Sequence, residues 1–522
     1  MARKALKEVR QLAFDEMFRA PTAGDVFAID FAFPEEFADQ LAQQETFNKH
    51  LFRPNTYLHK WWARRCGTTF RAILKQFVPD PERRDFYAPG GLEGKTVLDP
   101  MMGGGTTLHE AIRLGAKVIG ADIDPIPIGQ ARASLTQAPL RELREAFDAF
   151  FADLYRRVGH YFQTECPDCK ETIDAQYILH GLLKRCACGE AVQIDQYELR
   201  QEEDRTLRIS PHTWGITENE EATKRRTRKG LRLIKKGEAV CPDCGQKFQE
   251  LLDRPFYARY VPIAIVGKCE AHGIFFRSPG PADLNRIQEA DRQRAALDFG
   301  PVERFAVKNG PKSSDLLSKN VKSYLDVFSS RQLLYLHHSI QLLSGYRGVA
   351  KLNLALLVST SLEFNSMLCG YKGWFKRRPG AIRHVFALHA YAFQYTVAEN
   401  NPVNHEKSSG NLQLLFRDRI ERGRKWAVAP VERKIARKGE TQVIKIPGEL
   451  DGGIEAHDQT SLMATQRQAF WLIHGDSRDL PIDDHTVDFV VTDPPYYQQV
   501  QNSHTNRTPW TSPRLATRCL TG

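Results

Sequence analysis

The stretch TVLDPMMGGGTTLHEAIRLGAKVIGADIDP, which begins at Thr96, constrains the fold more than any other part of the chain. The run Lys95–Leu98 predicts a strand, and the glycine-rich segment Asp99–Gly105 predicts a turn. Thr106–Leu114 then predicts a helix and Ala116–Ala121 a second strand. Two short strands joined by a helix are typical of a βαβ unit, whose strands lie parallel. The sequence therefore predicts an α/β fold.

The turn between these strands indicates a small charged ligand. Three consecutive glycines, Gly103–Gly105, let the backbone approach a ligand closely, and the helix that follows favours a negatively charged group at its N-terminus. Asp122 ends the second strand, where an acidic side chain can accept hydrogen bonds from ribose hydroxyls. The spacing G-x-G-x-x-G of dinucleotide sites and the Gly-Lys-Ser/Thr of P-loops are both absent here. Asp99 and Thr106 flank the glycines and strengthen the interpretation.

A second αβ-type segment, FWLIHGDSRDLPIDDHTVDFVVTDPPY, lies near the end of the chain. It predicts strands at Phe470–Ile473 and Val487–Val491, each followed by an acidic loop. Asp476 stands in the first of these loops and Asp493 in the second. A turn that merely ends a strand is the alternative interpretation of the second loop, because Asp and Pro both favour turns.

The cysteine spacing predicts metal sites. The chain has 10 cysteines and begins without the apolar run of an export signal, so metal ligation is a better explanation than a disulfide framework. C-x-x-C pairs followed by a second short pair are typical of zinc ribbons, and reduced core cysteines are the alternative. We expect two structural zinc sites, each built from neighbouring pairs: Cys166, Cys169, Cys186 and Cys188, then Cys241, Cys244, Cys269 and His272.

The net charge of +10 suits a polyanionic partner without requiring one. Three segments mix Lys and Arg with apolar or aromatic residues, at 224–236, 372–384 and 417–439. Such a composition suits phosphates and stacked bases, although a solvated helix face is an equally good explanation. No apolar segment is long enough to predict a membrane span, and we expect a cytoplasmic protein.

The composition along the chain predicts six regions. Long helices are expected from Ser329 to about Ala398, and 400–465 is expected to be loop-rich. The regions are a mainly helical segment at 1–90, a ligand-binding half of the core at 91–158, a zinc-ribbon insertion at 159–280, a helical and basic target-recognition region at 281–465, a second core segment at 466–500 and an irregular tail at 501–522.

The motifs together resemble a known family. DPMMGGGTT with ADIDP looks like the S-adenosylmethionine site of amino-methyltransferases, and DPPY is similar to their catalytic tetrapeptide. With HKWWARR at 59–65, the cysteine pairs and LEFNSMLCGYKGWFKRRPGAIRHVFALHAYAFQYTVAENNP at 362–402, the chain resembles the zinc-ribbon-containing adenine-specific DNA methylases over most of 45–500. The resemblance implies a Rossmann-like methyltransferase core interrupted by two zinc ribbons and a helical region, with DNA as the partner.

The resemblance also implies site residues. The catalytic residues would be Asp493, Pro494, Pro495 and Tyr496. The residues that bind S-adenosylmethionine would be Asp99, Pro100, Gly103, Gly105, Thr106, Asp122 and Asp476.

The chemistry of amine methylation explains the DPPY tetrapeptide. An exocyclic amine on a base is a poor nucleophile because its lone pair is delocalised into the ring. The Asp493 carboxylate would accept one amino hydrogen and the Pro494 carbonyl the other, which directs the lone pair toward the methyl group. Two prolines stiffen the loop, and the ring of Tyr496 offers a face for a base extruded from its duplex.

Two alternatives to adenine methylation in DNA remain at this stage. One is methylation of another exocyclic amine, at N4 of cytosine in DNA or N2 of guanine in RNA, because DPPY is shared widely. The other is a DNA-binding module without catalysis. Only 26 residues follow Tyr496, and they show no strand or helix pattern. We therefore expect the C-terminal strands of the family's sheet to be missing, or supplied by a complementary chain.

Overall fold

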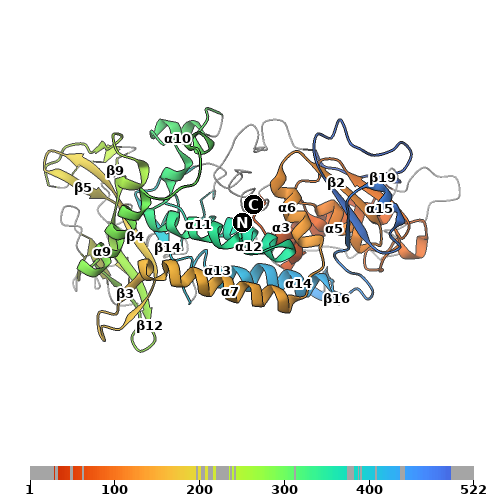
Figure 1. Cartoon of the computed structure of the whole chain (residues 1–522), viewed down its shortest axis with the longest axis horizontal. Coiled ribbons are helices and arrows are strands. Elements are labelled where there is room, and N and C mark those ends of the chain that lie inside the picture. Colours follow the sequence, from red (N-terminus) through yellow and green to blue (C-terminus); the bar gives the residue numbers. More distant parts are fainter. Residues whose placement is uncertain are drawn as a thin grey trace.

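The structure is a computed structural model. It describes residues 33–47, 51–61, 64–194, 243–310, 313–372, 381–385, 391–405, 408–435 and 441–494, together with Ile29, Cys241, Ala387 and short strands between 198 and 239. Figure 1 shows an elongated molecule with an antiparallel sheet at one end, a parallel sheet at the other and long helices between them.

The parallel sheet contains the strands that the two motifs predicted. Its five strands lie in the order β17 (Ile454–Ala456), β18 (Ala469–His474), β2 (Lys117–Asp122), β1 (Thr96–Asp99) and β19 (Phe489–Val490). All neighbours are parallel, and Val97 of β1 lies opposite Val118 on one side and Phe489 on the other. The α/β expectation with a parallel sheet is therefore confirmed.

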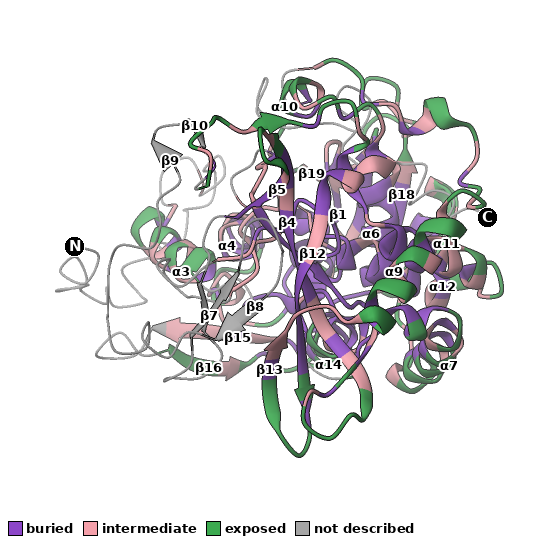
Figure 2. Ribbon diagram, turned by 90° about the vertical axis from the view of Figure 1, so that its left-hand side faces the viewer, coloured by how far each residue is buried: buried purple, intermediate pink, exposed green. Residues whose placement is uncertain are grey.

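Helices on this sheet bury their apolar faces against it. The helix α5 (Thr106–Arg113) connects β1 to β2, and α6 (Pro125–Leu135) follows β2. Leu108 and Ile112 of α5 pack with Val97 and Phe470 in one buried cluster. The burial of both faces explains the apolar runs of the strands, because a parallel sheet is covered on both sides. β1, β18 and α6 are accordingly drawn largely as buried in Figure 2.

The sheet extends beyond the predicted core segment. β17 precedes residue 466, where that segment was expected to begin, and α15 (Gln459–Ala464) connects β17 to β18. β19 lies at the edge of the described sheet. That a complementary chain supplies further strands of this sheet stays a prediction.

The antiparallel sheet is built around one long strand. Its seven strands are β3 (Gln163–Glu165), β4 (Thr172–Cys186), β5 (Gly189–Gln193), β11 (Gln249–Glu250), β12 (Tyr260–Cys269), β13 (Gly273–Arg277) and β14 (Thr396–Asn400). β4 pairs with β12 from Ala175 opposite Gly267 to Leu182 opposite Tyr260. β14 also pairs with β4, so the sheet is completed by residues far beyond the expected insertion at 159–280.

Three long helices connect the two sheets. These are α7 (Leu140–Val158), α11 (Ser330–Leu343) and α12 (Gly348–Ser361). In α7 the buried residues Leu143, Phe147, Phe150 and Leu154 recur at three- and four-residue intervals, which places them on one face. They belong to the largest apolar cluster of the described chain. Packing of these helices therefore fixes the parallel sheet relative to the antiparallel one.

Two expectations for the region after Ser329 were wrong. The helices do not run to Ala398, because α12 ends at Ser361 and β14 is a strand. The region 400–465 is not loop-rich but contains α13 (Leu412–Leu415), the π-helix η8 (Phe416–Glu421), α14 (Arg422–Ala427), and the hairpin β15 (Val431–Ile435) with β16 (Thr441–Lys445). Charged residues of this region, such as Glu432 and Glu449, are buried in ion pairs that join it to the rest of the fold.

The described N-terminal part is helical, as expected. It contains α3 (Glu35–Phe47), η2 (Pro54–Tyr57), α4 (Gly67–Gln76) and η3 (Pro81–Arg83). Arg53 after α3 donates to Glu110 of α5 at 2.7 Å and to Glu432 of β15 at 3.0 Å. All three side chains are at most 1% exposed. This buried network fastens the N-terminal part and the β15–β16 hairpin to the parallel sheet.

The remaining described elements are short or peripheral. They are η4 (Gly159–Phe162), β6 (Glu198–Arg200), β7 (Thr206–Ile209), β8 (Ile216–Glu218), β9 (Ile234–Lys235), β10 (Glu238–Ala239), η5 (Phe256–Arg259), α9 (Pro281–Arg294), η6 (Val302–Phe305), α10 (Ser314–Ser318) and η7 (Tyr324–Val327). Among the described residues, no helix combines the length and the apolar character needed to cross a membrane.

Candidate cofactor pocket and metal centres

A cavity of about 240 Å³ opens at the carboxyl ends of the parallel strands. This is the edge at which open parallel sheets bind ligands, because the loops after neighbouring strands meet there. The cavity is lined by Trp61, Arg65, Phe70, Asp99, Pro100, Met101, Met102, Gly103, Gly104, Thr106, Thr107, Asp122, Ile123, Asp124, Gly475, Asp476, Ser477 and Asp493.

The cavity therefore brings together most of the residues that the sequence singled out. Six of the seven expected cofactor ligands line it, from Asp99 to Asp476. Gly105 does not line it but forms the N-cap of α5, with a φ of 77° that a side chain would strain. Asp493 and Pro494 are described, and Asp493 lines the cavity while Pro494 is exposed. Pro495 and Tyr496 lie outside the described residues.

The glycine turn leaves room for an aromatic ring. A Cβ atom added at Gly104 would lie 3.0 Å from Cδ1 of Trp61, which is tighter than most Cβ contacts in proteins. Trp61 comes from the HKWWARR segment, about forty positions earlier in the chain. Its indole Nε1 is buried and has no hydrogen-bond partner among the described residues. The sequence motif was visible, but nothing in its spacing indicated that it lines this cavity.

Asp122 is held in place by two backbone donors. Its Oδ2 accepts from the N–H of Gly103 at 3.0 Å, and its Oδ1 accepts from the N–H of Asp124 at 2.8 Å. Burial, followed by the charges of Asp124 and Asp99, raises the pKa of Asp122 to about 6. The carboxylate is thus ionised at neutral pH and fixed at the end of β2, with lone pairs left to accept hydrogen bonds from a ligand.

The other carboxylates of the cavity differ in their surroundings. Asp99 is 3% exposed and accepts from the N–H of Met101 at 3.2 Å, while its burial raises its pKa. Asp476 lies on the rim, where hydrogen bonds from Arg478 lower its pKa to about 2. Asp493 forms an ion pair with Arg65, through Nε and Oδ2.

The charge of the cavity limits the ligands that it can hold. Five of its lining residues are acidic and one, Arg65, is basic. A ligand that carries a positive centre gains from this field, whereas a pyrophosphate would be repelled by it. The exposed side chain of Ile123, beside Asp122, adds an apolar surface at the same place.

Two clusters of four soft ligands lie at opposite ends of the β4–β12 pair. In each, the ligand atoms all lie within 4.8 Å of one another. One cluster contains Cys166, Cys169, Cys269 and His272, and the other contains Cys186, Cys188, Cys241 and Cys244. All eight predicted ligands are therefore used, but the expected grouping was wrong. The second and third pairs in sequence share one cluster, and the first and fourth share the other.

Antiparallel pairing explains this crossed arrangement. Cys166 and Cys169 precede the start of β4, and Cys186 is its last residue. β12 runs in the opposite direction and ends at Cys269, so the end of β12 lies beside the start of β4. The pair Cys241 and Cys244, which precedes β12, is left at the other end. The sequence pattern fits two consecutive ribbons and this interleaved arrangement equally well.

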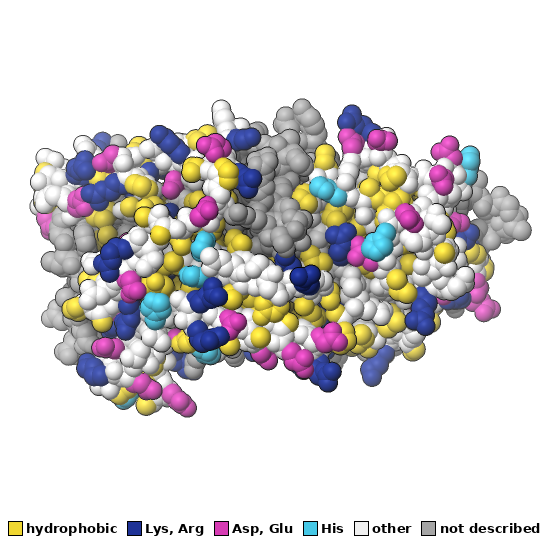
Figure 3. All heavy atoms as spheres, in the orientation of Figure 1, with side chains coloured by type: hydrophobic (Ala, Val, Ile, Leu, Met, Phe, Trp, Pro, Cys, Tyr) yellow, Lys and Arg dark blue, Asp and Glu magenta, His cyan; other side chains and the backbone are white. Residues whose placement is uncertain are grey.

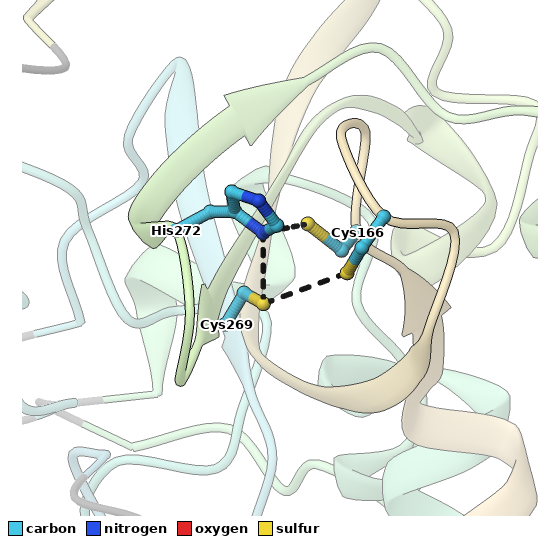
Figure 4. Close-up of side chains that lie close together, drawn as sticks. Cys166, Cys269 and His272 are labelled. Carbon is cyan, nitrogen blue, oxygen red and sulfur yellow. Dashed lines mark hydrogen bonds between the residues drawn. The ribbon is translucent and has the colours of Figure 1, made fainter.

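The first cluster has the dimensions of a tetrahedral zinc site. Figure 4 shows Cys166, Cys269 and His272 pointing toward one another. His272 Nδ1 lies 3.6 Å from Cys166 Sγ and 3.4 Å from Cys269 Sγ, and Cys169 Sγ lies 3.8 Å from Cys269 Sγ. Ligands bound tetrahedrally to Zn²⁺ would be separated by about 3.6 Å for nitrogen and sulfur and about 3.8 Å for two sulfurs. Both clusters could hold metal ions, and this donor set suits zinc.

The basic segments give a mixed result. Residues 219–233 and 373–380, which make up most of two of them, lie outside the described residues. In the third, Arg419 packs over the ring of Tyr57 at 3.9 Å and Arg424 donates to the carbonyl of Thr136 at 2.9 Å. Both are buried and serve the fold. On the face shown in Figure 3, described Lys and Arg side chains are interspersed with Asp and Glu.

Comparison of the chain with protein-family models, with curated proteins and with solved structures gave no match.

Proposed function

We propose that this protein is an S-adenosylmethionine-dependent DNA methyltransferase that modifies the exocyclic amino group of adenine. The observation that carries the proposal is the meeting of the glycine turn, Asp122 and Asp493 in one acidic cavity. These elements come from β1, β2 and β19, whose carboxyl ends are adjacent. A methyl donor and an amine acceptor need such a meeting, because methyl transfer requires direct contact between the two.

The residues present fit the methyl donor. The turn at Gly103–Gly105 suits its amino-acid end, Asp122 suits its ribose hydroxyls, and Ile123 with Asp476 suits its adenine. Its sulfonium carries a positive charge, which the acidic lining favours. The bound donor supplies an electrophilic methyl group, and the protein must supply the orientation of the amine.

Asp493 is the residue proposed to act on the amine. Its carboxylate accepts one amino hydrogen, and the carbonyl of Pro494 accepts the other, so that the nitrogen lone pair is no longer drawn into the ring. The nitrogen then forms a bond to the methyl carbon as the carbon–sulfur bond breaks, and the sulfur keeps the bonding electrons. The methylated nitrogen finally loses one proton to solvent.

The zinc ions would be structural in this proposal. Both clusters use four protein ligands, which leaves no open position for a substrate. They lie at the ends of strands of the antiparallel sheet, whereas Asp493 follows β19 of the parallel sheet. Their contribution is to hold the ends of β4 and β12 together, so that the sheet offers a stable surface to the connecting helices.

Tritiated methyl transfer to unmethylated bacterial DNA, followed by separation of the nucleosides, tests the proposal. Label in N6-methyladenine is expected. Label in cytosine or in RNA guanine would replace the adenine assignment with one of the other amines. DNA binding without any cofactor binding by calorimetry would favour a DNA-binding module and would contradict the cofactor site itself.

A further inference from the structure

The described residues of the HKWWARR segment, 59–61 and 64–65, contact both the helical region and the cavity. At its start the Lys60 ammonium donates to Glu363 Oε1 at 2.9 Å, and the backbone N–H of Lys60 donates to Thr360 Oγ1 at 3.1 Å. His59 Nε2 lies 3.0 Å from Ser359 Oγ. These contacts hold the start of the segment on the end of α12 and the turn that follows it.

The other end of the segment reaches the carboxylate of the DPPY tetrapeptide. Trp61 packs over the glycine turn, and Arg65 Nε donates to Asp493 Oδ2. The Arg65 and Asp493 side chains are 27% and 29% exposed, so a ligand can reach the pair from the cavity. Arg65 is basic, whereas the other charged residues of the lining are acidic.

We propose that Arg65 is a positioning residue for methyl transfer. This inference rests on the proposed function. It holds Oδ2 of Asp493 and thereby leaves Oδ1 to accept the amino hydrogen of the substrate. A carboxylate rotates readily about its terminal torsion, so that neither oxygen has a fixed place without a partner. A guanidinium N–H bound to one oxygen fixes the plane of the group and the direction of the other oxygen.

The positive charge of Arg65 also offsets the negative charges that surround Asp493. Asp99 and Asp122 line the same cavity, and their negative charges oppose a third carboxylate there. An Arg–Asp pair that served only the surface would contribute little to stability and nothing to a reaction. A positioning role and a purely structural role for Arg65 therefore predict different rates of methyl transfer, not different stabilities.

The test compares Arg65→Ala and Arg65→Lys with a matched control, Lys95→Ala. Lys95 pairs with Asp488 at 2.9 Å, and the two side chains are 37% and 32% exposed. They immediately precede β1 and β19, at the opposite end of these strands from the cavity. Turnover of tritiated methyl transfer to unmethylated bacterial DNA is measured with the cofactor KM. Arg65→Ala should lower kcat roughly ten- to hundredfold, as expected for a misplaced reacting group, with little change in cofactor KM. The kcat of Arg65→Lys should lie between those of Arg65→Ala and the wild type, and the kcat of the control should match that of the wild type.

Two further measurements separate positioning from a structural role. Added guanidinium ion should restore part of the rate of Arg65→Ala, and thermal melting should show that the variant is folded. In an Asp493→Asn background, Arg65→Ala should cost much less than in the wild type, because its effect passes through Asp493. Wild-type turnover in Arg65→Ala, or equal costs in both backgrounds, would overturn this inference alone. A wild type without any methyl transfer would overturn the proposed function, and the inference with it.

Discussion

The Sγ atoms of Cys169 and Cys269 lie 3.8 Å apart, although 100 positions separate the two residues in the sequence. The antiparallel pairing of β4 with β12 produces this contact, and it assigns each cysteine pair to a partner that sequence order does not suggest. The arrangement places one candidate metal site at each end of the β4–β12 pair.

The crossed grouping predicts the metal content of paired variants. Cys166→Ser with Cys269→Ser should lose about one zinc ion per chain, because both residues belong to the same cluster. Cys166→Ser with Cys186→Ser should lose about two. Elemental analysis of chelator-free protein measures both, and grouping in sequence order would give the opposite result. Wild-type protein without zinc would exclude both arrangements.

Cofactor affinity should depend on Asp122 and on pH. Asp122→Ala removes charge-assisted hydrogen bonds worth about 1.5 to 3 kcal/mol, so the dissociation constant for S-adenosylmethionine should rise roughly ten- to hundredfold. Because the pKa of Asp122 is raised to about 6, affinity should fall as the pH drops through that value and the carboxylate is protonated. Calorimetry across this range checks both. Asp484→Ala is the control, since Asp484 is exposed and lies outside the cavity.

Asp493 should be needed for transfer but not for cofactor binding. Asp493→Ala removes the acceptor that exposes the lone pair of the amine, so methyl transfer should disappear while the cofactor dissociation constant changes little. Tyr496→Ala should be milder, since loss of base stacking costs about 1 to 3 kcal/mol. Transfer assays with separated nucleosides measure these effects. A fully active Asp493→Ala variant would mean that the tetrapeptide is only a turn.

Glu399 should stabilise the junction between the antiparallel sheet and α11. It accepts from Arg331 Nε at 3.0 Å and lies 2.7 Å from His180 Nε2, and the Glu399 side chain is 1% exposed. Glu399→Ala leaves Arg331 buried without its partner, so the free energy of unfolding should fall by about 3 to 5 kcal/mol. Urea unfolding measures this, with Glu145→Ala, at an exposed pair, as the control.

The same junction should weaken in acid. Burial alone would raise the pKa of Glu399, but the Arg331 charge and the His180 contact outweigh it and hold that pKa below its ordinary value. A carboxyl with a lowered pKa in the folded state stabilises the fold above its unfolded pKa, and this stabilisation is lost as the pH falls below that value. Wild-type stability should therefore decline more steeply than that of Glu399→Gln below about pH 4.5, the ordinary pKa of a glutamate carboxyl.

The parallel sheet and most of its cavity could be read from the sequence because each signal is local. A strand, its turn and the next helix are consecutive, and their apolar runs and glycines need no distant partner to be recognised. Parallel strands then end at one edge, so Asp99, Asp122, Asp476 and Asp493 had to meet once the strands were neighbours. The cysteine spacing likewise identified all eight ligands.

Long-range pairing was beyond the same reasoning. The start of β14 fell within the helices expected up to Ala398, yet these residues form a strand because they pair with β4. Arg65 was part of a visible motif, but its contact with Asp493 depends on how α12 and the parallel sheet are placed. Local propensity is weak compared with such tertiary contacts, which routinely override it.

The sequence by itself thus determined which residues gather in the cavity and in the two clusters of this protein: the glycine turn, the carboxylates at the strand ends, and the cysteines with His272. Only the tertiary structure decided how they are grouped, with Cys169 beside Cys269 and Arg65 on Asp493. The physical reason is that a residue type and its local spacing fix what a side chain can bind, whereas strand direction and helix packing fix which distant side chain it meets.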